Sequence, residues 1–335
     1  MPPELRQMQA VDAIAQTISS SPDDIVYISG SLIEGFGNRS SDIDVFLVTA
    51  GEPAYRGPFG SVLGDYYLDL EIYQLDYMSA LSWRLDGLEV SDFPAVWLTP
   101  LADLDLYYRT LIGEAHQNAE GFEALRNTFR HDVIQRLLAT WCGLRYTASM
   151  QHAREELAAG RFINAALAGQ AATAAGLDSY LASRGEAFPS LKWRFEKLAR
   201  LHGAASALYE RAWSLKAAGA RDPEPYLAGV EALGVDLGME AYDAWSLDAV
   251  PLRTNGEVHD YDVAGDAHIV HNGRYVYRAG PGLRAVVRLL HDGAATRASV
   301  VSALSRGGSE PSSEVAHRVN DAIAKLQACN LIRAY

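Results

Sequence analysis

The sequence predicts an α/β (α+β) domain at the N-terminus, then an α-helical bundle domain, then a small winged-helix-like domain. Three observations along the 335 residues predict this order. Up to about residue 118, short runs of β-branched and aromatic residues alternate with turns. From 119 to 216 the chain is rich in alanine, with apolar residues at helical spacing. From 255 to 335, strand-like runs precede three helical stretches.

Three strands are expected in the N-terminal domain, over residues 24–30, 42–48 and 66–76. The first is apolar enough for a buried strand, and the other two alternate apolar with acidic residues at period two. Between them, residues 51–65 contain four glycines and two prolines, which predicts a long turn.

The remaining elements follow from helical periodicity and turn signals. Helices are expected over 126–150, 155–181 and 190–215, and the irregular, Gly- and Pro-containing stretch 217–254 is expected to be a partly helical linker. In the C-terminal domain, strands joined by Gly-containing turns are expected over 259–280, with HNGR (271–274) as a hairpin signal. Helices follow over 282–293, 296–307 and 313–330, the second with Thr296 as its N-cap.

Composition excludes several classes of protein. The net charge of −13 disfavours general nucleic-acid binding, which needs many cations against phosphates. No apolar run approaches the 18 residues of a membrane span, and the first twenty residues lack an export pattern. Two cysteines, Cys142 and Cys329, fit a reducing cytoplasm, and the histidines lack zinc-binding spacing. We therefore expect a cytoplasmic protein without membrane association.

The segment Val26–Val48 contains the most informative motif. A buried strand ends in Gly30-Ser31, and a polar turn leads to Ser41 and a strand with Asp42 and Asp44 on one face. Two such carboxylates repel each other unless a cation lies between them, and oxygen ligands of this kind suit Mg²⁺. The Gly-Ser turn lets backbone amides and a hydroxyl approach an anion closely.

A second acidic strand follows in LDLEIY (68–73), where Asp69 and Glu71 share a face. Either carboxylate there is a candidate third metal ligand, or a base that accepts a proton from an attacking hydroxyl. Three carboxylates and two metal ions suit an in-line phosphoryl displacement. The residues leave the choice open, with a slight preference for Glu71 as base. Asp-x-Asp alone usually marks a solvated strand face, but a Gly-Ser turn and a further acidic strand rarely accompany it by chance.

These residues carry a resemblance. The run SGSLIEGFGNRSSDIDVFLV, within residues 24–75, resembles the DNA polymerase β-like nucleotidyltransferase superfamily. The resemblance implies a mixed sheet, a triphosphate held at Gly30 and Ser31, and a two-metal Mg²⁺ site on Asp42, Asp44 and one acid of the third strand. This chain departs from the family in offering two acids there, Asp69 and Glu71.

The middle region resembles the helical domain that closes over the nucleotide in kanamycin-type and minimal nucleotidyltransferases. In SLKWRFEK, Lys192 is a candidate phosphate contact beside Trp193, whose equal alternative is a place in the helix core. Arg39 and Ser41, just before the aspartates, are further candidate contacts, although an exposed loop arginine needs no function.

The C-terminal region resembles the winged-helix module that recognises leader peptides in the maturation of ribosomally made peptides, through VVRLLHDGAATRASVVSALSR (286–306) and the helix before LIRAY. That resemblance implies a peptide bound as an added strand between a sheet edge and a helix. A purely structural appendage is the alternative. Nucleic acid is not expected, because residues 255–335 contain nine Lys or Arg against eight Asp or Glu.

The sequence therefore predicts a nucleotidyltransferase catalytic domain (1–118), a helical domain (119–216), a linker (217–254) and a winged-helix-like domain (255–335). We expect a Mg²⁺-dependent transfer of a nucleoside monophosphate from a nucleoside triphosphate to a hydroxyl, releasing pyrophosphate. The expected acceptor is a ribosomally made peptide of the lasso type, or another protein. The alternatives are an aminoglycoside-like acceptor, or a non-catalytic transferase fold whose C-terminal module binds a partner or DNA.

Overall fold

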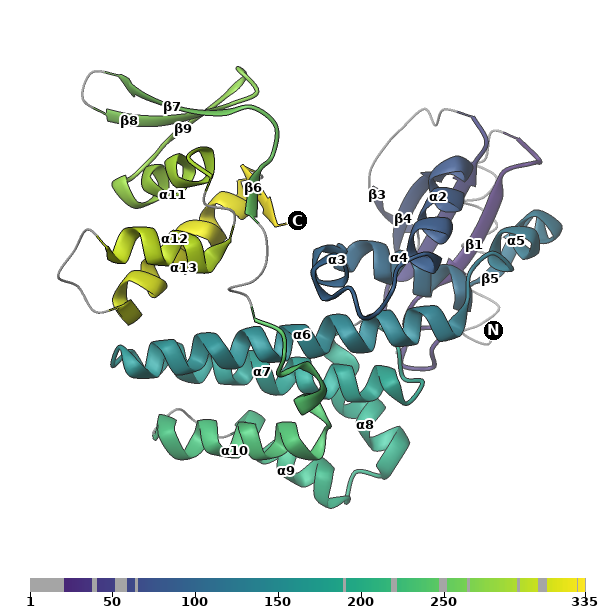
Figure 1. Ribbon diagram of the computed structural model, residues 1–335. Helices are drawn as coiled ribbons and strands as arrows, with labels where there is room; N and C mark the ends of the chain where they lie inside the picture. Colours follow the sequence, from purple (N-terminus) through teal and green to yellow (C-terminus); the bar gives the residue numbers. More distant parts are fainter. Residues whose placement is uncertain are drawn as a thin grey trace. The chain divides into compact units, whose positions relative to one another are not determined.

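The strands near the N-terminus form one mixed sheet in the computed structural model of the chain (Figure 1). Its order is β3-β4-β2-β1-β5, with β2 and β4 parallel and the other neighbouring pairs antiparallel. The strands are β1 (Ile25–Ser29), β2 (Ile43–Thr49), β3 (Phe59–Leu63), β4 (Tyr66–Gln74) and β5 (Glu114–Gln117). The expected strands at 24–30, 42–48 and 66–76 and the mixed sheet are thereby confirmed.

The structure describes residues 21–37, 41–51, 59–63, 66–188, 191–217, 222–246, 252–263, 266–293, 296–306, 312–329 and 331–334. Among the described residues, no helix combines the length and apolarity needed to cross a membrane.

The two faces of the sheet have different chemistry because side chains alternate along each strand. One face carries a purely aliphatic cluster, made of Val26, Ile28, Ile43, Val45, Leu47, Leu68, Leu70 and Ile72 together with Leu32. On the other face Tyr27 stacks on Phe46 and on Phe122, with ring centroids 4.8 Å apart in both pairs. The acidic positions of β2 and β4 share this second face.

One expectation for this domain is wrong. Residues 51–65 do not form only a turn, because Phe59–Leu63 is strand β3, paired antiparallel with Tyr66–Leu70 of β4. At Gly60 an added Cβ would meet the hydroxyl oxygen of Tyr67, the far end of a side chain that is 52% exposed. A glycine that indicates a turn in the sequence thus lies within a strand, because sheet pairing overrides local composition.

Helices make up most of the remaining chain. They are α2 (Leu75–Asp86), α3 (Phe93–Leu98), α4 (Leu101–Ile112), α5 (Ala119–Arg126), α6 (His131–Ala158), α7 (Phe162–Ser183), α8 (Arg194–His202), α9 (Ala207–Ala217) and α10 (Pro223–Asp236), with short 3₁₀ helices at Leu191–Trp193 and Met239–Tyr242. The expected helical stretches are present, and α10 lies inside the segment expected to be a partly helical linker.

The chain folds into two compact units built from discontinuous segments. The first unit takes the chain up to residue 90, together with 99–139 and 181–203. The second takes 91–98, 140–180 and 204 to the end. The domain boundaries expected from the sequence stay a prediction.

The last part of the second unit, residues 252–334, is called the C-terminal module below. It has a three-stranded sheet, β7 (Val258–Val263), β8 (Asp266–His271) and β9 (Tyr275–Arg278), followed by α11 (Pro281–His291), α12 (Arg297–Ser305) and α13 (Ser312–Ala328). Strands β6 (Leu252–Thr254) and β10 (Ile332–Ala334) pair separately.

Local signals in this module are confirmed. Positive φ at Asn272 and Gly273 forms the expected hairpin turn, and Thr296 caps α12 by accepting the Ser299 backbone N–H at 3.1 Å. The expected order of strands before three helices is also present, whereas the winged-helix assignment stays a prediction.

Candidate metal centre

The turn after β1 places backbone groups beside the acidic strands. Gly30 has φ +84°, a left-handed conformation that favours glycine, and its carbonyl accepts the Glu34 backbone N–H at 3.1 Å. The Ser31 carbonyl accepts the backbone N–H groups of Phe36 and Gly37 at 2.9 and 2.7 Å. Ser31 is buried. The segment 31–37 is therefore a compact, internally hydrogen-bonded loop, called the Gly-Ser loop below.

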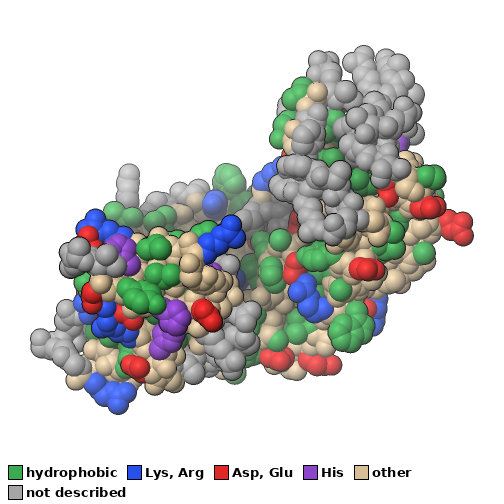
Figure 2. Space-filling model, turned by 90° about the horizontal axis from the view of Figure 1, so that it is seen from above, with side chains coloured by type: hydrophobic (Ala, Val, Ile, Leu, Met, Phe, Trp, Pro, Cys, Tyr) green, Lys and Arg blue, Asp and Glu red, His purple; other side chains and the backbone are tan. Residues whose placement is uncertain are grey.

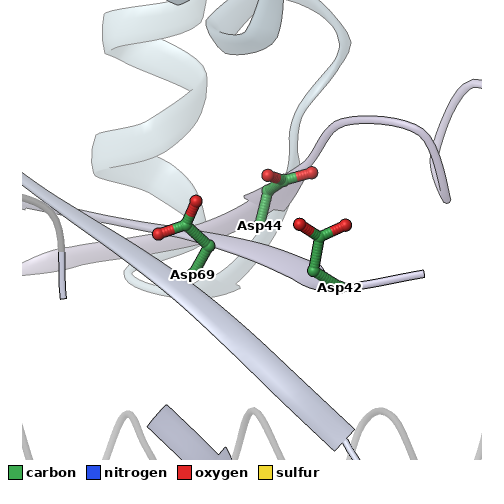
Figure 3. Close-up of side chains that lie close together, drawn as sticks. All are labelled: Asp42, Asp44 and Asp69. Carbon is green, nitrogen blue, oxygen red and sulfur yellow. The ribbon is translucent and has the colours of Figure 1, made fainter. Parts of the chain in front are cut away.

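Three carboxylates gather next to this loop. Asp44 of β2 lies opposite Asp69 of the parallel strand β4, and Asp42 precedes β2 on the same face. One oxygen from each of the three lies within 4.8 Å of the others. Figure 3 shows the three carboxyl groups on the same side of the two strands. Parallel pairing thus joins acidic residues that are 25 or more positions apart in the sequence.

The electrostatic character of the group is clearest at Asp44. Burial raises the pKa of Asp44 to about 6, the charge of Arg109 lowers it, and the neighbouring carboxylates of Asp42 and Asp69 raise it. Its side chain is only 14% exposed. A carboxylate that is buried beside two others is held at a high electrostatic free energy, which a bound cation relieves.

Glu71 does not belong to this group, although the sequence slightly favoured it as the base. It lies two residue pairs further along the two strands, opposite Phe46, and accepts a hydrogen bond from the Tyr73 hydroxyl. Burial and this hydrogen bond raise the pKa of Tyr73. The register of β2 against β4 therefore brings Asp69, rather than Glu71, to the aspartate pair.

The other residues predicted to bind nucleotide have different environments. Ser41 lies in the described chain directly before Asp42. Lys192 is exposed, with its Nζ 5.4 Å from the centroid of the Trp193 ring. Arg39 lies outside the described residues. The roles of these side chains stay predictions.

Two helices hold the Gly-Ser loop from outside the motif. Phe36 stacks on Trp193 with centroids 5.5 Å apart, which agrees with a packing role for Trp193. The Arg200 guanidinium lies 4.3 Å from the centroid of Phe36 and donates to the Glu34 carbonyl at 3.1 Å. The Glu34 carboxylate accepts the Tyr108 hydroxyl. Helix α8 and helix α4 thereby fix the loop beside the carboxylates.

Sequence reasoning missed Arg109, in the last turn of α4, which contacts the carboxylate group. Its Nη1 lies 3.0 Å from Asp44 Oδ1, and its Nε donates to Asp105 Oδ2 at 2.7 Å. The only signal in the sequence was the i, i+4 spacing of Asp105 and Arg109, which predicts a local helix pair but no contact with a distant strand.

The residues present fit a Mg²⁺ ion. Three carboxylates supply the hard oxygen ligands that Mg²⁺ prefers. The backbone leaves them room at Gly30, where a Cβ would lie 1.9 Å from Asp44 Oδ2 and 2.8 Å from its Cγ. Any other side chain at this position would displace the Asp44 carboxylate.

Comparisons with known proteins give a distant structural similarity. The chain is similar to a nucleotidyltransferase-like protein from Exiguobacterium sibiricum 255-15, over 71% of this chain and 77% of that chain. The sequence identity is 15% and the TM-score is 0.41. No protein-family model matches the sequence, and no curated protein matches it. The fold and the site are described above from the strands and side chains of this chain and not from that similarity.

Proposed function

We propose that this chain is a Mg²⁺-dependent nucleotidyltransferase that moves a nucleoside monophosphate from a nucleoside triphosphate to an acceptor hydroxyl. The observation that carries this proposal is the group of Asp42, Asp44 and Asp69 next to a Gly-Ser loop. The arrangement agrees with the sequence resemblance to the DNA polymerase β-like superfamily. In the reaction the acceptor oxygen bonds to the α-phosphorus, and the bond from that phosphorus to pyrophosphate breaks.

In this proposal the side chains of the site have different roles. Asp42 and Asp44 hold the metal, which when bound neutralises charge on the phosphates and on the leaving pyrophosphate. Asp69, opposite Asp44 in the sheet, accepts the proton of the acceptor hydroxyl. The Gly30-Ser31 turn and Lys192 receive the β- and γ-phosphates, and the helices that brace the Gly-Ser loop keep it in place for them.

Nucleotide binding tests the site first. Thermal unfolding is followed with each of the four nucleoside triphosphates, with and without Mg²⁺, for the parent chain and for Asp44→Asn. A ligand at one hundred times its dissociation constant adds about 2.7 kcal/mol of stability. We expect a metal-dependent rise for at least one triphosphate and no rise in Asp44→Asn. No rise with any triphosphate would refute the proposal.

A matched pair of substitutions tests the assignment of the base. Asp69→Asn removes a carboxylate of the group, whereas Glu71→Gln changes the next acidic position of β4. Loss of a general base lowers turnover about 10²- to 10⁴-fold. Turnover is measured as the rate of pyrophosphate release. We expect this rate to fall by that factor in Asp69→Asn and to stay near that of the parent in Glu71→Gln. The opposite result would assign the base to Glu71.

For the acceptor we propose a peptide or protein bound by the C-terminal module. The observation that favours it is strand β9 at the edge of the β7-β8-β9 sheet, where Tyr275 and Val276 are 52% and 64% exposed. An open edge strand with exposed apolar side chains suits an added strand. Figure 2 shows Lys and Arg mixed with Asp and Glu on the visible face of this module, at the left of the view, which suits nucleic acid poorly.

Transfer from α-labelled nucleotide tests the acceptor class, with an extract of the producing organism as the source of acceptors. A labelled product that protease degrades supports a peptide or protein, and a protease-resistant small product supports the aminoglycoside-like alternative. Val276→Lys on β9 is expected to reduce labelling. Tyr261→Lys, at the opposite edge on β7, is the matched control and is expected to leave it unchanged.

A further inference from the structure

A chain of three charged side chains reaches from helix α4 to the carboxylate group. Asp105 and Arg109 lie one helical turn apart, and Arg109 also contacts Asp44 on β2. We propose that Arg109, anchored by Asp105, is a positioning residue that fixes the Asp44 carboxylate for metal binding. This inference rests on the proposed function, since it concerns the same metal centre.

The geometry of the guanidinium supports a positioning role. Nε donates to Asp105 Oδ2 at 2.7 Å, and Nη1 lies 3.0 Å from Asp44 Oδ1. The two carboxylates therefore contact different nitrogens of one planar, rigid group. The Arg109 backbone is held as well, because its carbonyl accepts the Ser29 hydroxyl at 2.7 Å. Strand β1, strand β2 and helix α4 are thus joined at one residue.

Burial places the guanidinium behind the carboxylates rather than in the space for a ligand. Nη1 of Arg109 is buried at its 3.0 Å contact with Asp44, and the Arg109 side chain is 17% exposed. Gly30 is a close neighbour of this nitrogen, because a Cβ built at Gly30 would lie 3.0 Å from Nη1. The nitrogen of Arg109 that faces the carboxylate group is thus shielded from solvent, and its contact with the site is through Asp44.

The charge of Arg109 and its role in positioning Asp44 predict different effects on metal affinity. A cation beside a ligand carboxylate repels a divalent ion, so a purely electrostatic Arg109 would weaken metal binding, and Arg109→Lys would leave the affinity unchanged. A positioning Arg109 has the opposite consequence, because lysine keeps the charge but its single ammonium group cannot hold Asp44 and Asp105 in the same geometry. The charge-conserving variant therefore separates the two roles.

The experiment measures Mn²⁺ binding to the full chain without nucleotide, by electron paramagnetic resonance of the free ion. Mn²⁺ uses the same oxygen ligands as Mg²⁺. The two variants are Arg109→Lys and Asp105→Ala. The first changes the group that contacts Asp44, and the second removes the carboxylate that anchors Arg109. The matched control is Asp103→Ala, also on α4, which removes an ion pair with Arg84 at 2.6 Å instead. Circular dichroism confirms that each variant is folded.

We expect Arg109→Lys to weaken Mn²⁺ binding about 10- to 100-fold, the range for side chains that orient metal ligands. Asp105→Ala is expected to weaken it too, and Asp103→Ala to bind as the parent does. Parent-like affinity in a folded Arg109→Lys or Asp105→Ala chain would overturn this inference alone. A parent chain that binds no Mn²⁺ would overturn the proposed function, and the inference with it.

Discussion

Replacing Asp44 with asparagine should stabilise the metal-free protein while it abolishes metal binding. Burial and the neighbouring carboxylates raise the pKa of Asp44 to about 6 against its ordinary value of 3.8, even though Arg109 opposes them. A carboxyl whose pKa is raised in the folded state favours folding below its ordinary pKa. That contribution is lost as the pH rises through 6, so at neutral pH the ionised carboxylate destabilises the fold. Asparagine resembles the protonated form at every pH.

The size of the effect follows from the two pKa values. The difference between 3.8 and about 6 corresponds to about 3 kcal/mol, at about 1.36 kcal/mol for each pKa unit. Linkage predicts that this gain in unfolding free energy is nearly complete at pH 7 and falls below about 1 kcal/mol at pH 4. Urea unfolding of parent and Asp44→Asn in a chelator, at both pH values, measures it directly.

Adding Mg²⁺ should reverse the order of stability at pH 7. The metal ion stabilises only the chain that binds it, so the parent gains unfolding free energy and Asp44→Asn does not. An Asp44→Asn variant that is less stable than the parent in chelator at pH 7 would refute the reasoning. So would a difference of the same size at pH 4, because the effect would then not arise from ionisation.

Two further predictions concern a turn and a second carboxylate. Gly30→Ala and Gly35→Ala both place a Cβ at positive φ, which costs about 1–2 kcal/mol, but only the first meets Asp44. Mn²⁺ binding should therefore be lost in Gly30→Ala and retained in Gly35→Ala, and equal losses would contradict the role of that contact. For Glu156, hydrogen bonds outweigh burial and lower the pKa to about 2, so its stabilisation is complete above pH 4.5 and is lost as the pH falls to 2. Glu156→Gln should lower the unfolding free energy by about 3 kcal/mol at pH 7 and by little at pH 2.5, as urea titrations at both pH values would show.

Local signals in the sequence predicted most of the elements, because periodicity and caps act over a few residues. The alternation in β2 and β4, the Asn272-Gly273 turn and the Thr296 cap are of this kind. Strand β3 was missed for the opposite reason. The glycines and prolines of residues 51–65 indicate a turn locally, and only pairing with β4 makes Phe59–Leu63 a strand.

The candidate site was predicted as far as single strands allow. Period two put Asp42 and Asp44 on one face, but it left both Asp69 and Glu71 as candidates, with a slight preference for Glu71 as the base. The parallel register that pairs Asp44 with Asp69 decides between them, and register is a tertiary property. The contact between Arg109 and Asp44 could not be predicted for the same reason, since no local pattern relates α4 to β2.

Two carboxylates with arginine partners, the fully buried Glu156 and the partly buried Asp44, show how a candidate metal site differs from a structural ion pair in this chain. Glu156, fully buried, receives hydrogen bonds from Arg161 at 2.8 Å and Asn164 at 3.0 Å, with a further contact from His317, and its pKa falls. Asp44 has one arginine, which Asp105 shares, and two carboxylates beside it, and its pKa rises. The described residues supply enough hydrogen-bond donors for Glu156 and too little positive charge for Asp44. The missing charge at Asp44 is the physical reason to expect a cation there, because a bound cation lowers the electrostatic free energy of the ionised carboxylate.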